Sequence, residues 1–263
     1  ELDVFTLLHA RPMTAPQLAG RIHGNRRATA ILLDALAALG LLDRSSDSAP
    51  VYRVRPVAAA ALTETGSRGM LGMVRHQGNC LRNWAQLARV VRSGRPANPP
   101  PSIRGADSDL ASFIRAMHEV SEPMAMPLIR SLGPLKFKHL LDLGGASGTW
   151  TIPFLRLNPR ACATIFDQPD VIPMARRRMK TLGLAGRVNL VPGSYNRDQL
   201  PPGADLAWVS AIVHQNSREQ NRAMWWKYAR TPIRNVSSAK SVSPVSTTPN
   251  SSQASPSSTD PRP

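Results

Sequence analysis

The chain has 263 residues, enough for two modest domains with separate cores, and it contains no apolar run of about 18 residues, so we expect no membrane-spanning segment. Its formal net charge of +16 suggests nucleic acid as a partner, but the basic residues are spread along the chain and arginine greatly outnumbers lysine, which indicates a compositional bias rather than a binding surface. The two cysteines are too few for a disulfide framework and no Cys/His cluster has metal-ligand spacing, so we expect a cytoplasmic protein without a metal.

Residues 1–62 are predicted to form a winged-helix domain. Thr14-Ala-Pro-Gln17 has the form of a capping box with proline in the first turn, which marks the start of a helix. Gly40 can cap the end of the strongly amphipathic helix that precedes it. The whole pattern predicts helices over 2–10, from Thr14 and over 26–39, then short strands at 41–43 and 51–54.

This domain has two possible roles. In a winged-helix regulator the third helix would enter the major groove of DNA. Here that helix carries only Arg26 and Arg27, at its start, and its body is almost wholly alanine and leucine, so its exposed face lacks the side chains that read base edges. We therefore interpret it as a dimerisation domain and expect no nucleic-acid partner. The alternative is a DNA-binding regulator whose second domain senses a ligand.

Residues 63–132 are predicted to link the two domains. Apolar residues recur at helical spacing over 69–93 and over 108–132, and the Pro-rich segment 95–101 connects these helices. The two prolines inside the second helix are expected to kink or divide it.

The N-terminal third is also predicted to form a homodimer. The Ala/Leu-rich helix over 26–39 and the Met-rich helix over 69–93 carry more apolar surface than one small domain can hide. A second copy of the chain is the usual way to cover such a surface.

The most informative motif is His139-Leu-Leu-Asp-Leu-Gly-Gly-Ala-Ser-Gly-Thr-Trp150. An apolar run ends in an acidic residue and a glycine-rich turn, which is typical of a buried parallel strand that presents a loop to a nucleotide-like ligand. The dinucleotide motif G-x-G-x-x-G would require glycine where the chain has Ala146 and Thr149. Small residues at Gly144, Ala146 and Gly148 fit instead the loop of S-adenosylmethionine (SAM) methyltransferases.

Three further strands follow at a regular rhythm, over 161–167, 187–195 and 204–214. The first ends at Asp167, where a nucleotide-binding unit places a carboxylate for the ribose hydroxyls; alternatively, Asp167 caps the next helix. The last ends on His214. Alternating strands and helices predict a doubly wound α/β sheet, whose ligands lie at the carboxyl ends of its strands.

At this point the chain resembles the SAM-dependent O-methyltransferases that carry an N-terminal winged-helix dimerisation domain, such as the caffeate, flavonoid, acetylserotonin and hydroxyneurosporene methyltransferases. The resemblance extends from residue 1 to about residue 224. It implies a methyl transfer from SAM to a hydroxyl of a small aromatic or natural-product molecule. The matching segments are 141–148, 166–171, 183–188, 193–195 and 213–215.

The resemblance also implies roles for individual residues. His214 would be the general base, although a histidine at a strand end can also simply cap or pack. The family often has His-Asp-Trp where this chain has His214-Gln-Asn216, and an adenine-binding aspartate where it has Ser194, whose hydroxyl can still accept a hydrogen bond. The implied acceptor contacts, which could equally be core residues, are Phe113, Met117 and His118. The implied cofactor contacts are Asp142, Gly144, Gly145, Ala146, Gly148, Asp167, Gln168, Gly193, Ser194 and Tyr195.

The family pattern fades after Met224. Residues 133–229 therefore predict an incomplete methyltransferase domain whose sheet stops at its fourth strand, and we expect no regular element beyond this point. Residues 230–263 are dominated by Ser, Pro and Thr and are predicted to be a disordered tail. A chain that starts at Glu1 and ends in this way suggests a truncated or frame-shifted form of a longer protein, or alternatively a low-complexity linker. An inactive dimerising remnant is thus a third possible function, and we expect weak or no activity.

Overall fold

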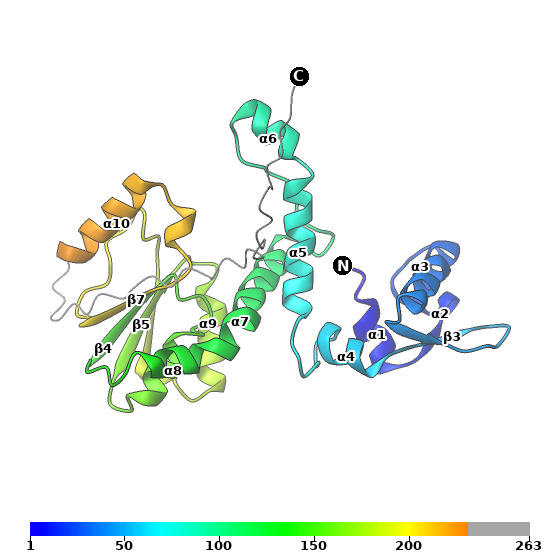
Figure 1. The fold of residues 1–263 in the computed structure, drawn as a ribbon, viewed down its shortest axis with the longest axis horizontal. Coiled ribbons are helices and arrows are strands. Elements are labelled where there is room, and N and C mark those ends of the chain that lie inside the picture. The colour runs from blue at the N-terminus through cyan, green and yellow to red at the C-terminus, as the bar shows by residue number, and fades with distance from the viewer. Residues whose placement is uncertain (231–263) are drawn as a thin grey trace, which may run out of the picture.

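The computed structural model describes residues 1–230. It is elongated, with a small N-terminal body at one end, a body built on a parallel sheet at the other, and a pair of long helices between them (Figure 1). The two helices are α5 (Leu71–Trp84) and α7 (Ala106–Ser131), which pack against each other.

The N-terminal body contains the helices and strands that the sequence predicts. The capping box is formed, because Thr14 Oγ1 accepts from the Gln17 N–H while Gln17 Oε1 accepts from the Thr14 N–H. Gly40 has φ +72° directly after the third helix, and the Leu41 N–H bonds back to the Leu36 carbonyl at 3.0 Å. The sheet order is β1-β3-β2, all antiparallel. The elements are α1 (Val4–Ala10), β1 (Met13–Thr14), α2 (Ala15–Arg21), α3 (Arg26–Ala38), β2 (Leu42–Arg44), β3 (Val51–Val54) and α4 (Pro56–Leu62).

The central helices differ from the prediction in two respects. The segment 69–93 forms two helices, α5 and α6 (Leu87–Ser93), rather than one. In contrast, α7 runs unbroken through Pro123 and Pro127, which were expected to kink or divide it. Both prolines are exposed, so water can bond the carbonyls that lose their helical partners, while neighbouring buried side chains such as Ile129 hold the helix against the second body.

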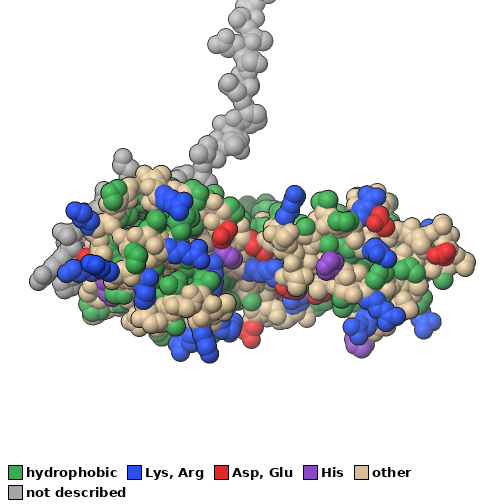
Figure 2. All heavy atoms as spheres, turned by 90° about the horizontal axis from the view of Figure 1, so that it is seen from below, with side chains coloured by type: hydrophobic (Ala, Val, Ile, Leu, Met, Phe, Trp, Pro, Cys, Tyr) green, Lys and Arg blue, Asp and Glu red, His purple; other side chains and the backbone are tan. Residues whose placement is uncertain are grey.

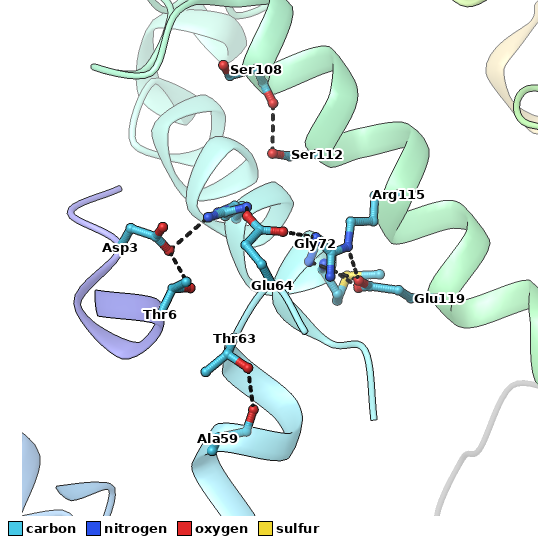
Figure 3. Close-up of polar contacts among 12 residues, drawn as sticks. Asp3, Thr6, Ala59, Thr63, Glu64, Gly72, Ser108, Ser112, Arg115 and Glu119 are labelled. Atoms are coloured by element: carbon cyan, nitrogen blue, oxygen red, sulfur yellow. Dashed lines mark hydrogen bonds and ion pairs between the residues drawn. The ribbon is translucent and has the colours of Figure 1, made fainter. Parts of the chain in front are cut away.

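A chain of ion pairs joins the N-terminal body to these helices (Figure 3). The Arg75 guanidinium of α5 donates to Asp3 at 2.9 Å and also to Glu64. Glu64 accepts in turn from Arg115 of α7, so one carboxylate is shared between two helices. Arg75 is nearly buried, and this network therefore fixes how the first body meets α5 and α7.

Glu119→Gln is expected to lower the free energy of unfolding by about 2 kcal/mol, because hydrogen bonds to a charged group contribute roughly 1.5–3 kcal/mol each. The Glu119 carboxylate is 9 % exposed; it accepts from Arg115 and from the Gly72 and Met73 N–H groups in the first turn of α5. Urea unfolding measures the loss. Asp107→Asn, an exposed change on the same helix, is the control, and an equal loss in both variants would contradict the role of the network.

The second body is a four-stranded parallel sheet in the order β6-β5-β4-β7. Neighbouring residues of the central strands face opposite sides: Leu140 and Ile165 pack under α7, α8 and α9, whereas Leu141 and Phe166 pack under α10. Both faces are therefore covered, and the doubly wound α/β prediction is confirmed. The elements are β4 (His139–Leu143), α8 (Thr151–Leu157), β5 (Cys162–Asp167), α9 (Ile172–Thr181), η1 (Ala185–Arg187), β6 (Val188–Pro192), β7 (Leu206–Val209), η2 (Val213–Gln215) and α10 (Arg218–Arg230).

The end of this body corrects two expectations. Strand β7 stops at Val209, so His214 lies beyond the strand and not at its end. Helix α10 continues past Met224, where no further element was expected, because Met224 and Tyr228 lie four residues apart and pack together on the sheet, while Ser217 and Gln220 cap the helix. The predicted disorder of the tail falls on residues 231–263, outside the described part of the chain.

None of the helices within residues 1–230 is both long enough and apolar enough to cross a bilayer. Basic side chains are distributed over the whole length of the face seen in Figure 2, with acidic ones between them, rather than gathered in one stripe.

Candidate functional site

Four loops meet at the carboxyl ends of the parallel strands, where ligands of such sheets bind. Two backbone hydrogen bonds tie the loops after β4 and β6 to the end of β5: the Gly144 N–H donates to the Phe166 carbonyl at 2.9 Å, and the Gly193 N–H donates to the Asp167 carbonyl at 2.8 Å. The loops that follow β4, β5, β6 and β7 are residues 144–150, 168–171, 193–205 and 210–212.

The loop after β4 explains the spacing of its small residues. Gly144, Ala146 and Gly148 have φ values of +69°, +48° and +77°, so every second residue is left-handed. Glycine adopts this conformation freely and a small residue such as alanine at modest cost, whereas a bulky side chain would be strained. A Cβ on Gly145 would lie 2.7 Å from Cγ of Asp142, so the loop passes directly over that carboxylate.

Asp142 lies beneath this loop. Its side chain is 1 % exposed and accepts a hydrogen bond of 2.6 Å from Thr151 Oγ1 at the start of α8. Burial, partly offset by the hydrogen bond from Thr151 and assisted by the nearby Asp167 carboxylate, raises the pKa of Asp142 to about 7. The structure thus places Asp142 beneath the glycine loop, where it supports the loop through Thr151.

Asp142→Asn is expected to flatten the pH dependence of stability. The folded chain binds the Asp142 proton more tightly than the unfolded chain, because its pKa is about 7 rather than 3.8. The resulting stabilisation is full below about pH 4 and is lost as the pH rises to about 7, at about 1.4 kcal/mol per pKa unit. Urea unfolding at about pH 5 and about pH 8 should show about 2–3 kcal/mol less change in the variant. An equal change in the free energy of unfolding between the two pH values in wild type and variant would show that the Asp142 proton does not cause the pH dependence. Asp170→Asn, at an exposed position, is the control.

Asp167 ends β5 and faces the glycine loop. Its Oδ2 accepts from the Ala146 N–H and its Oδ1 from the Gln168 N–H, both at 2.7 Å. Burial raises the Asp167 pKa, and the two N–H groups partly offset that rise. Helix α9 begins five residues later with Val171 as its N-cap, so the alternative role of Asp167 as a helix cap is wrong. Each carboxylate oxygen can accept a further hydrogen bond, as ribose hydroxyls would require.

The loop after β6 brings Ser194 and Tyr195 to the same edge. Ser194 is buried, and its N–H donates to Asp198 Oδ2 at 2.7 Å. Tyr195 is half-buried; burial raises its pKa, and a hydrogen bond with Asn216 from the His214 turn counteracts this. A Cβ on Gly193 would lie 2.5 Å from the Phe166 ring, so this position admits only glycine. The predicted residues of this loop are therefore gathered beside Asp167.

His214 lies in the short turn η2 and is exposed. The turn is fixed by Gln215, whose Nε2 donates to the Ala211 carbonyl at 2.9 Å. Ile212 anchors it to the glycine loop, because a Cβ on Gly144 would lie 2.7 Å from Ile212 Cγ2. The turn that carries His214 thus packs against the glycine loop through Ile212, and His214 itself lies beyond the end of β7.

The three predicted acceptor contacts on α7 separate in the structure. Phe113 packs on His76 of α5, with ring centroids 5.0 Å apart. Met117 is half-buried. His118 reaches the glycine loop, with Nδ1 at 3.1 Å from Thr149 Oγ1. Of the three, His118 is the residue that contacts the glycine loop.

The sequence did not indicate Arg178, Thr149 or Lys227. Arg178 of α9 donates to Thr149 Oγ1 at 3.0 Å beside a hollow of about 230 Å³ between α7, α8 and α9. Lys227 of α10 donates to three carbonyls of the loop after β6, among them that of Tyr195. Arg178 and Lys227 are each one basic residue among many in this chain, and only the fold distinguishes them. Among the described residues, no group of three or more His, Cys, Asp or Glu side chains could hold a metal ion.

Comparison with known proteins gives two family matches. Residues 1–64 match the O-methyltransferase dimerisation domain and residues 84–231 the O-methyltransferase domain. The chain is 32 % identical over 231 residues to the tetracenomycin polyketide synthesis 8-O-methyl transferase of Streptomyces glaucescens, covering 85 % of this chain and 67 % of that protein.

The chain also resembles solved structures of methyltransferases. The mitomycin 7-O-methyltransferase is 25 % identical with a TM-score of 0.72, over 88 % of this chain and 70 % of that one. Human N-acetylserotonin methyltransferase in complex with SAM is 23 % identical with a TM-score of 0.68, over 88 % and 70 %, which shows the shared fold. The chain spans about two thirds or less of the length of the curated relatives that it matches.

Proposed function

We propose, from the premise that the chain belongs to the O-methyltransferase family with an N-terminal dimerisation domain, that it transfers a methyl group from SAM to a hydroxyl of a small molecule. The single observation that carries this proposal is the glycine loop. Its alternate residues are left-handed, its Ala146 N–H is held by the Asp167 carboxylate, and the His214 turn packs against its first glycine. The aromatic and natural-product substrates in the names of the relatives support an acceptor of the same class.

The residues present fit SAM. A loop of glycine and alanine carries no large side chain that would keep a ligand away from its backbone, and a half-buried carboxylate at the neighbouring strand end offers acceptors for two ribose hydroxyls. In this proposal Asp142 acts through the loop. The residues that would hold SAM are Gly144, Gly145, Ala146, Gly148, Asp167, Gln168, Gly193, Ser194 and Tyr195.

In the proposed mechanism His214 acts as the general base. When bound, SAM supplies an electrophilic methyl group on a sulfonium sulfur. A neutral His214 imidazole takes the proton of the acceptor hydroxyl, which makes the acceptor oxygen a stronger nucleophile. Holding this oxygen in line with the methyl group contributes the larger share of the rate. A hydrogen bond between Tyr195 and Asn216 links the His214 turn to the loop after β6. This bond would hold the proposed base in a fixed position relative to the proposed cofactor contacts of that loop.

The proposed organisation has three parts within the described residues. Residues 1–62 form a dimerisation domain of the winged-helix type, residues 63–132 link the domains and carry acceptor contacts, and residues 133–229 bind SAM. Free Cys80 and Cys162 fit a cytoplasmic location. The exposed apolar side chains of α3 and its C-cap favour contact with protein over contact with DNA, since Ile31 and Leu39 are 59 % and 73 % exposed.

The chain is expected to form a homodimer through its N-terminal third. Exposed apolar side chains lie along α5 and α6, including Leu81, Trp84 and Val91. Light scattering at tens of micromolar should give about twice the chain mass of 28.6 kDa. Trp84→Asp should shift the chain toward the monomer, whereas Leu157→Asp on the other body should not. A monomeric wild type would remove this prediction.

Calorimetry with S-adenosylhomocysteine (SAH) tests the function. Saturable binding to the full chain supports the methyltransferase and excludes a remnant without a cofactor site. Absence of binding, together with dimer formation, would favour the inactive remnant. Binding to duplex DNA with a steep dependence on salt would favour the regulator instead.

A further inference from the structure

Arg178 holds the second half of the glycine loop. One nitrogen of its guanidinium, Nη1, donates to Ser147 Oγ and to Thr149 Oγ1, both at 3.0 Å, and lies 3.5 Å from the Ser147 carbonyl. Ser147 and Thr149 are buried, so water does not compete freely for these bonds. The side chain of α9 thus spans the two residues that flank Gly148.

His118 reaches the same hydroxyl from the opposite helix. Its Nδ1 lies 3.1 Å from Thr149 Oγ1, so α7 and α9 both bind this hydroxyl. Burial lowers the His118 pKa, and the charge of Arg178 lowers it too, while Glu122 and Glu119 act in the other direction. A neutral His118 imidazole can accept a hydrogen bond from the Thr149 hydroxyl, while the oxygen of that hydroxyl accepts a hydrogen bond from Arg178. The hydroxyl therefore has a partner both as donor and as acceptor.

Gly148 is the residue that this arrangement restricts. It has φ +77°, and a Cβ there would lie 2.7 Å from Met179 Cε, next to Arg178 on the same helix. Glycine loses more conformational freedom on ordering than any other residue. The contacts of Arg178 and His118 hold Ser147 and Thr149 in place before a ligand binds. Part of the conformational entropy of Gly148 is therefore lost on folding rather than on binding, which strengthens binding.

We infer that Arg178 and His118 are positioning residues that preorganise residues 147–149 for the cofactor, acting through the Thr149 hydroxyl. This inference rests on the proposed function and deepens it. It also gives His118 a different part from the acceptor contact that the family resemblance implies. Neither residue is proposed to touch the reacting atoms.

Calorimetry with SAH on the full chain tests the inference. Arg178→Met and Thr149→Val should each weaken SAH binding about tenfold, since hydrogen bonds from a charged group are lost. The double variant should lose clearly less than the hundredfold product of the two single losses, because both changes remove the Arg178–Thr149 hydrogen bond. His118→Ala should weaken binding about threefold, as expected for a neutral hydrogen bond. Arg178→Lys should retain most of the affinity, and exposed Arg177→Met all of it.

Two outcomes would overturn the inference: Arg178→Met binding SAH like wild type, or losses that multiply in the double variant. Hydrogen exchange of the Gly148 amide, which bonds the Gly145 carbonyl at 2.8 Å, gives a reading without ligand. It should quicken in Arg178→Met and not in Arg177→Met. If wild type fails to bind SAH, the proposed function fails, and this exchange measurement alone decides whether Arg178 orders the loop.

Discussion

His214→Ala is expected to lower turnover about 100- to 10,000-fold, the usual contribution of a general base, while SAH affinity stays within about twofold. The two effects separate because His214 is exposed in its own turn, whereas the proposed cofactor contacts come from the loops after β4, β5 and β6. Transfer of labelled methyl groups to a panel of phenolic natural-product acceptors measures turnover, and calorimetry measures affinity.

The controls for His214 distinguish chemistry from structure. His9→Ala changes an exposed histidine on α1 and should alter neither quantity. Gln215→Ala loosens the turn without removing the imidazole, so it should reduce turnover less than His214→Ala does. Equal losses of turnover and affinity in His214→Ala would identify a structural histidine. A wild type that binds SAH but transfers nothing would instead support an inactive remnant that retains its cofactor site.

Asp167→Asn is expected to weaken SAH binding about a hundredfold, since roughly 1.5–3 kcal/mol is at stake for each hydrogen bond to the charged group. Both oxygens of Asp167 accept from backbone N–H groups, those of Ala146 and Gln168. An amide has one oxygen and one NH₂ group, so in either orientation a donor would face a donor. The ribose would lose an acceptor at the same time.

Asp170→Asn is the matched control for Asp167, because Asp170 is exposed three residues further along the chain, in the loop after β5. It should bind SAH like wild type. Thermal unfolding of both variants is needed, since the loss of the Ala146 contact also relaxes the loop. If Asp167→Asn bound SAH normally, ribose recognition would have to be assigned to another group.

Much of the site could be predicted where local sequence and fold impose the same demand. Small residues at Gly144, Ala146 and Gly148 mark a loop of alternating left-handed residues, because larger side chains are strained there. Asp167 was predictable because a strand of buried residues ends on it. These signals depend on covalent geometry and burial, which a single sequence carries.

Other features depend on contacts that no local pattern shows. The apolar run over 204–214 looks like one strand, but Ala211 has φ +56° and turns the chain before His214, which alanine does not signal. The unbroken course of α7 through Pro123 depends on packing against the second body. Arg178 lies in a run of three arginines, and only its place on α9 beside buried Met179 turns it toward the loop.

The unbroken course of α7 has a mechanical consequence. It is a rod of 26 residues, about 39 Å long at 1.5 Å per residue. Two consecutive residues on it face different partners: Glu119 binds the first turn of α5, and His118 binds the end of the glycine loop. One continuous helix thus contacts both α5 and the glycine loop through neighbouring residues. Because Glu119 and His118 adjoin on α7, we expect a change in how the first body meets this helix to alter the order of Thr149.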